Sequence, residues 1–410
     1  MSKKLTITFV FLFSFLIGIG KNLPFPIFFP FGVAPIEWMI VCYAIYQLSI
    51  IKSGRVYFYW NIHLQNLLIL ISIFASFVFI SYIVNIFYYD GKIVDIFEIV
   101  RYLLSGYLIL ILLYMNKYYE ILLKGFVTGV IVSILFGFLE PNNLSVDIAS
   151  FSIPQIFNPN VLGVVAGFSV FFMVMLEIYK HSIKNLFIIL ILIALSVFTF
   201  SKAAWLIVFC GLISYVLVLF TSNNFRKRYF ILFLISVIFL LWYFGFIYHV
   251  IDVIMWKLRA TSFESSAIDG GTFSARLGLI LSGIYMFLDN PFFGIGISNF
   301  EHYHYQNESL LGDSFFADDN PNSAFVYILA GAGIFPFILW CLIVLYSIYL
   351  VYRLFRLKYR VIFSIIQVFL FSFVILLSGF IQNEILNAYF YWFFISLLIM
   401  NTKLKKVYVV

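Results

Sequence analysis

The stretch NLLILISIFASFVFISYIVNIFY, residues 66–88, decides the fold class, because it carries no charged side chain. At a rise of 1.5 Å per residue, a helix of this length crosses the roughly 30 Å hydrocarbon core of a bilayer. The rest of the chain has the same character: 64% of its 410 residues are hydrophobic and only 10% are charged. A soluble domain is closer to about one quarter charged. The sequence therefore predicts an all-α, polytopic membrane protein.

Further apolar runs bring the predicted total to about twelve membrane-spanning helices. We expect these other spans at roughly residues 5–20, 35–51, 97–115, 120–140, 160–179, 185–200, 203–220, 229–248, 323–351, 361–381 and 388–402. The first run is followed by Lys21-Asn22-Leu23-Pro24 and not by a small-residue cleavage site, so we interpret it as an uncleaved span and not as a signal peptide.

The distribution of basic residues predicts the orientation. If the N-terminus is cytoplasmic and the spans alternate, 18 of the 25 lysines and arginines fall on the cytoplasmic side, as the positive-inside rule requires. Both termini are then cytoplasmic, and residues 249–322 form a large extracytoplasmic loop between the ninth and tenth helices. The chain thus divides into helices one to nine (1–248), the outer loop (249–322) and helices ten to twelve (323–410).

Charge distribution and cysteine spacing argue against a nucleic-acid partner, a metal and a cofactor. The net charge of +7 arises from short basic clusters between apolar runs, which are topology signals, so we expect no nucleic-acid partner. Cys42, Cys210 and Cys341 lie inside apolar segments and have no metal-ligand spacing. We expect no metal and no cofactor.

Arg276 is the most informative residue of the outer loop. It opens the run RLGLILSGIYMFL, which predicts an amphipathic or re-entrant helix that Asp289-Asn290-Pro291 ends. A basic group on the outer side is disfavoured by topology, and an arginine suits a bidentate partner such as diphosphate. Lys202 and Arg101 are also on the outer side. Their simpler interpretations are snorkelling to the interface and a local ion pair.

Acidic residues and histidines of the same loop are candidate bases. Glu301, His302 and His304 follow the turn that contains Gly294 and Gly296, glycines that permit positive φ and close backbone approach. The His-x-His pair is a weak metal signal, and a histidine general base and an ordinary surface histidine both remain open.

Two Asn-Pro-Asn elements precede predicted helices at their extracytoplasmic ends, in FNPNVLG (157–163) and NPNS (320–323). They would present Asn158, Asn160 and Asn322 beside helix N-termini, which bind anions. The segment around Asp319 is typical of a turn and helix cap, and its carboxylates are alternative bases or ligands for sugar hydroxyls.

Four motifs in order resemble the O-antigen polymerase and ligase superfamily of bacterial membrane glycosyltransferases. These motifs are FNPNVLG, TFSKAAW (199–205), Arg276 with DNPFFGIGISNF (289–300), and NPNSAFVYILAGAGIF (320–335). The chain departs from the family at Pro321, where the ligases carry a histidine, and at Lys202, where arginine is usual. These departures favour a polymerase over a ligase.

The resemblance implies an enzyme of the bacterial cytoplasmic (inner) membrane. It would polymerise polyprenyl-diphosphate-linked repeat units of O-antigen, capsule or exopolysaccharide on the outer face, with inversion and without a metal. A chain-length regulator is a further candidate partner. The alternatives are an O-antigen ligase that transfers glycan to lipid A-core, and a flippase or transporter of lipid-linked oligosaccharide.

The resemblance and the residues together give two sets of candidate site residues. The catalytic candidates are Arg276, His304, His302, Glu301 and Asp319, and the substrate-binding candidates are Lys202, Arg101, Asn158, Asn160, Gly294, Gly296 and Asn322.

Overall fold

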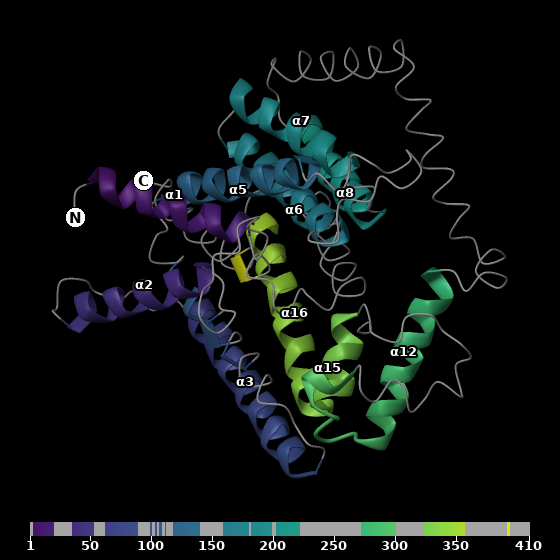
Figure 1. Cartoon of the computed structure of the whole chain (residues 1–410). Helices are drawn as coiled ribbons and strands as arrows, with labels where there is room; N and C mark the ends of the chain where they lie inside the picture. The colour runs from purple at the N-terminus through teal and green to yellow at the C-terminus, as the bar shows by residue number, and fades with distance from the viewer. Residues whose placement is uncertain are drawn as a thin grey trace.

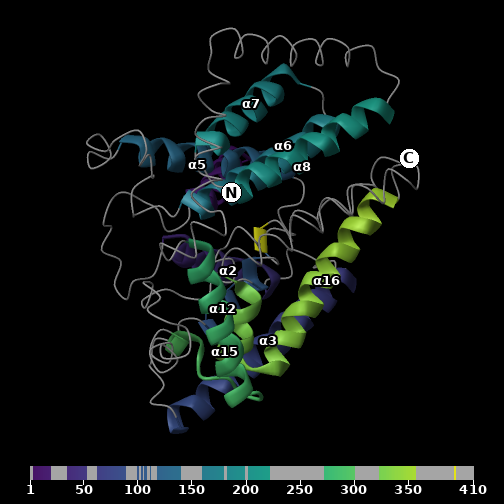
Figure 2. The same cartoon turned by 90° about the vertical axis from the view of Figure 1, so that its right-hand side faces the viewer.

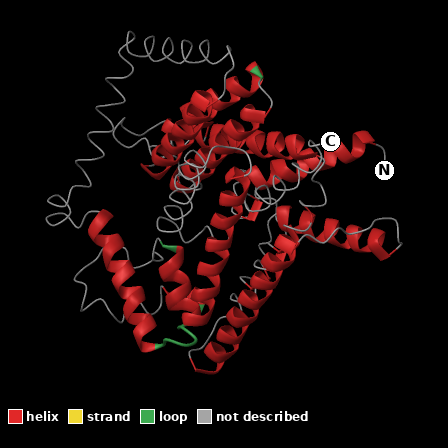
Figure 3. Cartoon of the chain, turned by 180° about the vertical axis from the view of Figure 1, so that it is seen from behind, coloured by secondary structure: helices red, strands yellow, loops and turns green. Residues whose placement is uncertain are grey.

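The computed structural model consists of helices joined by short turns in the part of the chain that it describes (Figures 1 and 3). The described residues are 3–19, 35–52, 62–88, 99–100, 103–104, 106–108, 111, 118–139, 159–179, 182–198, 202–221, 272–300, 323–356 and 392–393. No strand occurs among them, which confirms the predicted helical class.

Most of the predicted spans within the described ranges are helices at the expected positions. The helices are α1 (Lys3–Ile19), α2 (Pro35–Lys52), α3 (Ile62–Tyr88), α5 (Tyr119–Leu139), α6 (Pro159–Tyr179), α7 (Ile183–Phe198), α8 (Lys202–Thr221), α12 (Thr272–Asp289), α15 (Ala324–Ala332) and α16 (Ile334–Arg356). The predicted spans at 97–115, 229–248, 361–381 and 388–402 lie largely or wholly outside the described residues.

One helix among the described residues is both long and apolar enough to cross a membrane by itself. It is the 23-residue segment Gln65–Phe87 within α3, whose most apolar 18 residues have a mean hydropathy of 2.7. Shorter apolar helices of 10–17 residues occur in α1, α2, α6, α7, α8, α12 and α16. The total of about twelve spans therefore stays a prediction.

The expected single helix over 323–351 is instead two helices, α15 and α16, separated at Gly333. Gly333 has φ 86° and ψ −172°, a backbone conformation that an L-residue with a side chain rarely adopts. Its N–H still donates to the Leu329 carbonyl at 3.2 Å and closes the last turn of α15. The prediction of one continuous span was wrong because the run AGAGIF is apolar throughout, so hydropathy does not register the change of direction.

Helices α3 and α16 pack along each other in opposite directions. Near the start of α3, His63 contacts Tyr346 and Arg353 toward the end of α16. In the middle, the Phe74 and Trp340 ring centroids are 6.0 Å apart. The C-terminal end of α3 therefore lies at the end of the molecule where α16 begins, at the bottom of Figure 1.

Besides the α3–α16 pair, a second group of helices, α1, α5, α6 and α8, packs through glycines. A Cβ on Gly129 of α5 would meet the Phe15 carbonyl of α1, so the two helix backbones are in close approach. Helices α6 and α8 also pack closely, with Gly167 against Ile207 and Gly211 against Phe171. Because the earlier residue of α6 meets the earlier residue of α8, these two helices are parallel.

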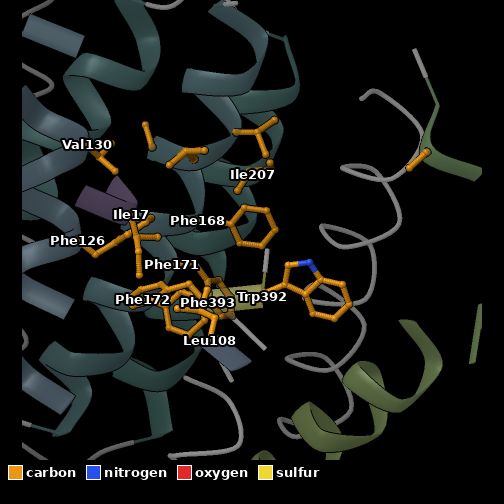
Figure 4. Close-up of a cluster of buried hydrophobic side chains, with 14 of the residues drawn as sticks. Ile17, Leu108, Phe126, Val130, Phe168, Phe171, Phe172, Ile207, Trp392 and Phe393 are labelled. Carbon is orange, nitrogen blue, oxygen red and sulfur yellow. The ribbon is translucent and has the colours of Figure 1, made fainter. Parts of the chain in front are cut away.

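Aromatic side chains join the two groups (Figure 4). Phe126 of α5 stacks on Phe393 with centroids 4.6 Å apart, and the neighbouring Trp392 meets Trp340 of α16 edge-on at 6.1 Å. All four rings are fully buried. The Trp392–Phe393 pair thus connects α5 to the α3–α16 pair through one continuous core.

Candidate functional site

Helices α12 and α15 run in the same direction, in contact through the C-terminal half of α12, and they diverge toward their N-termini (Figure 1). The α-carbon of Gly283 on α12 faces Val326 on α15, where an added Cβ would clash. The chain leaving the C-terminal end of α12 then hydrogen-bonds to Ala330 and Gly331 at the C-terminal end of α15. Their N-termini therefore point the same way.

A small separate core holds this pair together. Its members are the buried residues Leu279, Met286, Ile295, Phe300 and Ala330. They come from α12, from the segment that follows it and from α15, so the three pieces form one packed unit. This unit, residues 272–300 with α15, is called the α12–α15 unit below.

The parallel packing sets the position of Arg276. Arg276 lies in the N-terminal half of α12, about 10 Å along the axis before Gly283, whereas Ser323 lies about 4–5 Å before Val326. The Arg276 turn therefore extends about 6 Å beyond the start of α15 at the same end of the unit. Only the backbone of Arg276 is described.

Ser323 begins α15 as its N-cap. Its backbone is extended (φ −145°, ψ 113°), and its hydroxyl accepts a hydrogen bond from the Val326 N–H at 3.5 Å. This confirms the cap predicted for the segment that ends at Ser323. The first turn of a helix presents N–H groups that have no partner within the helix and carries the positive end of the helix dipole. The end of the unit that holds the Arg276 turn is therefore suited to an anion.

The opposite end of the unit is closed by the loop Pro291–Ile297, called the docking loop below. Its Ile295 N–H donates to the Ala330 carbonyl at 2.9 Å, and its Gly296 N–H donates to the Gly331 carbonyl at 2.8 Å. In return, the Ile334 N–H donates to the Pro291 carbonyl at 2.9 Å. The docking loop therefore covers the break between α15 and α16 and satisfies backbone groups that the break leaves open.

Gly294 and Gly296 shape the docking loop. They have φ 65° and φ 95°, and a Cβ on Gly294 would lie 2.5 Å from the Ala330 carbonyl oxygen. Their N–H groups donate to the carbonyls of Asn290 and Gly331 at 2.9 and 2.8 Å. Glycine is therefore required here by the backbone, and the predicted role of both residues in substrate binding stays a prediction.

The docking loop and the Arg276 turn do not coincide, although the sequence motif joins them. Arg276 and Asp289 are separated by about 20 Å of helix axis. The part of the motif that contains the glycines therefore supports α12 from one end, while Arg276 stands near the other end.

Two residues of α3 that sequence reasoning missed also hold the docking loop. The Ser81 hydroxyl donates a hydrogen bond to the Phe293 carbonyl. The Asn85 amide nitrogen donates to the Ser81 carbonyl at 2.8 Å and to the Phe293 carbonyl at 3.4 Å. A serine and an asparagine inside the apolar run 66–88 were the available signal.

The buried side chain of Asn85 uses its amide nitrogen in hydrogen bonds but not its amide oxygen. Its side chain is 0% exposed, and its Oδ1 atom has no hydrogen-bond donor within the described ranges. A buried polar atom without a partner costs about 1–3 kcal/mol. The hydrogen bonds that its amide nitrogen donates to Ser81 and Phe293 offset this cost.

The remaining predicted site residues fall into two sets. Lys202 begins α8, and Asn160 lies in the first turn of α6. Because α6 and α8 are parallel, both residues lie at the N-terminal end of this pair of helices. Only their backbone is described. The residues wholly outside the described ranges are Arg101, Asn158, Glu301, His302, His304, Asp319 and Asn322. The α6–α8 pair and the α12–α15 unit lie apart in both Figure 1 and Figure 2, so the convergence of Lys202 and Arg276 on one ligand stays a prediction.

The described residues contain no group of three or more histidine, cysteine or acidic side chains that could hold a metal ion.

Comparison with known proteins adds one finding. Residues 186–341 match the family model described as O-antigen ligase. The matched stretch begins in α7, includes α8, α12, the docking loop and α15, and ends within α16; α3 lies outside it. No curated protein matches the chain.

Proposed function

Because the match over residues 186–341 supports the O-antigen polymerase and ligase superfamily of glycan-modifying membrane enzymes, we propose that this chain is a polysaccharide polymerase. It joins polyprenyl-diphosphate-linked oligosaccharide repeat units of O-antigen, capsule or exopolysaccharide. The reaction takes place on the outer face of the bacterial cytoplasmic membrane, with both termini of the enzyme in the cytoplasm.

The observation that carries the proposal is the parallel packing of α12 on α15 inside the matched region. It brings the turn that contains Arg276 to the same end as the N-terminus of α15. An arginine at the same end as the positive pole of a helix dipole would give a diphosphate two sources of positive charge. In the sequence, Asn320-Pro321-Asn322 directly precedes Ser323, the N-cap of α15.

The reaction requires little else of the protein. A hydroxyl of one repeat unit attacks C1 of the sugar on the other, the C1–O bond to diphosphate breaks, and the polyprenyl diphosphate leaves with the bonding electrons. The hydroxyl proton passes to a base, for which Glu301, His302, His304 and Asp319 are the candidates. A single displacement of this kind inverts the anomeric centre and needs no metal ion.

Arg276 has the main electrostatic role in this scheme. Negative charge grows on the departing diphosphate, so a cation that contacts it is worth more in the transition state than in the ground state. Lys202 and Arg101 are further candidates for the same charge. A lysine supplies charge without the bidentate geometry of a guanidinium.

A ligase is the second candidate, because the matching family model is described as an O-antigen ligase. Pro321 favours the polymerase, since it occupies the position where the resemblance places a histidine in the ligases. A flippase is disfavoured, because charged residues in mid-span positions along a translocation path are expected of one, and this chain has almost none.

The test of the diphosphate role is substitution of Arg276. In a strain that lacks the chromosomal gene, we expect Arg276→Ala to abolish the polymer ladder while the protein reaches the membrane in normal amount. Arg276→Lys should restore little. Lys184→Ala, an exposed cation at the start of α7, is the matched control and should leave the ladder unchanged. A normal ladder from Arg276→Ala would refute the role.

Deletion of the gene separates the candidate functions. Single repeat units capped onto the acceptor, with the ladder gone, are expected for a polymerase. Long chains retained on the polyprenyl carrier would indicate a ligase. Lipid-linked units trapped on the cytoplasmic side would indicate a flippase.

A further inference from the structure

The docking loop has an anchor outside the matched family region. Ser81 and Asn85 of α3 both donate to the Phe293 carbonyl, whereas the matched region begins at residue 186. We propose that Ser81 and Asn85 are positioning residues for the polymerase reaction. They hold the docking loop so that α12, and Arg276 on it, keep their register against α15. The inference rests on the proposed function.

The loop fixes this register together with the core of Leu279, Met286, Ile295, Phe300 and Ala330. It leaves α12 at Asp289 and makes its hydrogen bonds to Ala330 and Gly331 within a few residues. A shift of the loop therefore displaces α12 relative to α15. Phe293 lies between the end of α12 and these hydrogen bonds, and its carbonyl points to α3.

Helix α3 is a fixed support for the loop, because it is held to α16 along its length. His63 contacts Tyr346 and Arg353 at one end. Phe77 stacks on Phe335, at the start of α16, with centroids 5.5 Å apart. Functional groups that depend on loops need such a rigid surrounding shell to hold their geometry. Figure 2 shows α3 and α16 alongside each other next to α12 and α15.

The hydrogen bonding of Asn85 supports a role beyond packing. Its amide nitrogen is used on Ser81 and Phe293, while its Oδ1 atom is buried without a donor within the described ranges. An apolar side chain would fill the site without an orphaned acceptor. What the asparagine adds over an apolar side chain is its N–H donors, and these reach the loop.

Loss of this support should slow the chemical step more than it weakens substrate binding. Displacement of a catalytic group by about 1 Å costs up to about a hundredfold in rate. A contact that matters chiefly in the transition state lowers kcat and leaves KM nearly unchanged. A residue that binds the glycan directly would raise KM instead.

The experiment uses membranes that contain the full-length chain, with lipid-linked repeat unit from a deletion strain as the substrate. We expect Ser81→Ala and Asn85→Ala each to lower kcat about tenfold, with KM and the amount of protein unchanged. Ser81→Thr keeps the hydroxyl and should restore most of the rate. Ser76→Ala is the matched control, because this exposed serine donates to Ser72 within the same helix.

Hydrogen exchange of the docking loop is measured on the same variants, and exchange should be faster in Ser81→Ala than in Ser76→Ala. Wild-type kcat in both Ser81→Ala and Asn85→Ala, or a raised KM at constant kcat, would overturn the positioning role. If the wild-type chain does not elongate the lipid-linked unit, the proposed function fails, and the exchange comparison alone decides whether α3 anchors the loop. Equal exchange in Ser81→Ala and Ser76→Ala would also overturn the inference.

Discussion

Substitution of Gly294 by alanine should detach the docking loop from the break between α15 and α16. The residue has φ 65°, and an added Cβ would lie 2.5 Å from both the Ala330 oxygen and the Gly331 carbonyl carbon. These are backbone atoms at the end of a packed helix, so they cannot rotate away as the tip of a flexible side chain can.

The magnitude follows from what the substitution introduces. An alanine held in the left-handed region costs about 1–2 kcal/mol. The contact of the new Cβ with the Ala330 and Gly331 backbone adds about 1–3 kcal/mol, the usual cost of overpacking. The docked state is therefore destabilised by about 2–5 kcal/mol, and because each 1.4 kcal/mol is a factor of ten, it loses about thirtyfold or more in population.

The assay is hydrogen exchange of peptides that cover the docking loop, in protein reconstituted into lipid discs. Amides that exchange through local opening report the free energy of that opening, so the Ile295 and Gly296 amides should exchange about thirtyfold faster or more in Gly294→Ala. The polymer ladder should fall in parallel.

Gly278→Ala provides the control, because Gly278 lies on α12 and a Cβ there meets nothing within 4 Å. It should be neutral or slightly stabilising, since alanine favours a helix over glycine by about 1 kcal/mol. Unchanged exchange of the loop in Gly294→Ala would refute the steric argument.

Two other sites allow independent tests. Gly129→Leu should destabilise the α1–α5 pair by about 3 kcal/mol, because the new side chain meets the Phe15 backbone. Thermal unfolding in detergent measures this loss. Gly106→Ala is the control and should behave as wild type, because its Cβ would lie at an ordinary 3.6 Å from its nearest neighbour. Burial, with a contribution from Arg353, lowers the pKa of His63 below its usual 6.5, so the unfolded state takes up the proton more readily and stability should fall as pH drops below about 6.5. His63→Gln should flatten this dependence, and an unchanged pH profile in that variant would show that other groups cause it.

The helices could be predicted from the sequence because the lengths of apolar runs specify them directly. The run at 120–140 is α5, Tyr119–Leu139, and the run at 160–179 is α6, Pro159–Tyr179. The Ser323 cap was also recognisable, since it follows a polar turn and precedes an apolar run. These features are local, so neighbouring residues are sufficient to indicate them.

The arrangement of the site depends on contacts that a single sequence does not encode locally. Gly333 lies in an apolar run where glycine is compatible with a continuous helix. The helix ends there because the docking loop hydrogen-bonds to the backbone on both sides of Gly333. Ser81 and Asn85 are visibly polar, but nothing in their run indicates that their partner is Phe293. Conversely, one motif contains both Arg276 and Gly294, yet the intervening α12 keeps them far apart.

The break at Gly333 also matters for how the chain fits a bilayer. As one continuous helix, α15 and α16 together would be about 50 Å long, well beyond the hydrocarbon thickness of roughly 30 Å. Helix α16 alone is about 34 Å long and matches that thickness with a modest tilt. The surplus length, α15, is turned into the interior of the protein and packs on α12. The short helix α15 therefore adds nothing to the length that must match the bilayer. Gly333 allows one apolar run to provide both a helix of membrane-spanning length, α16, and a wall of the candidate site.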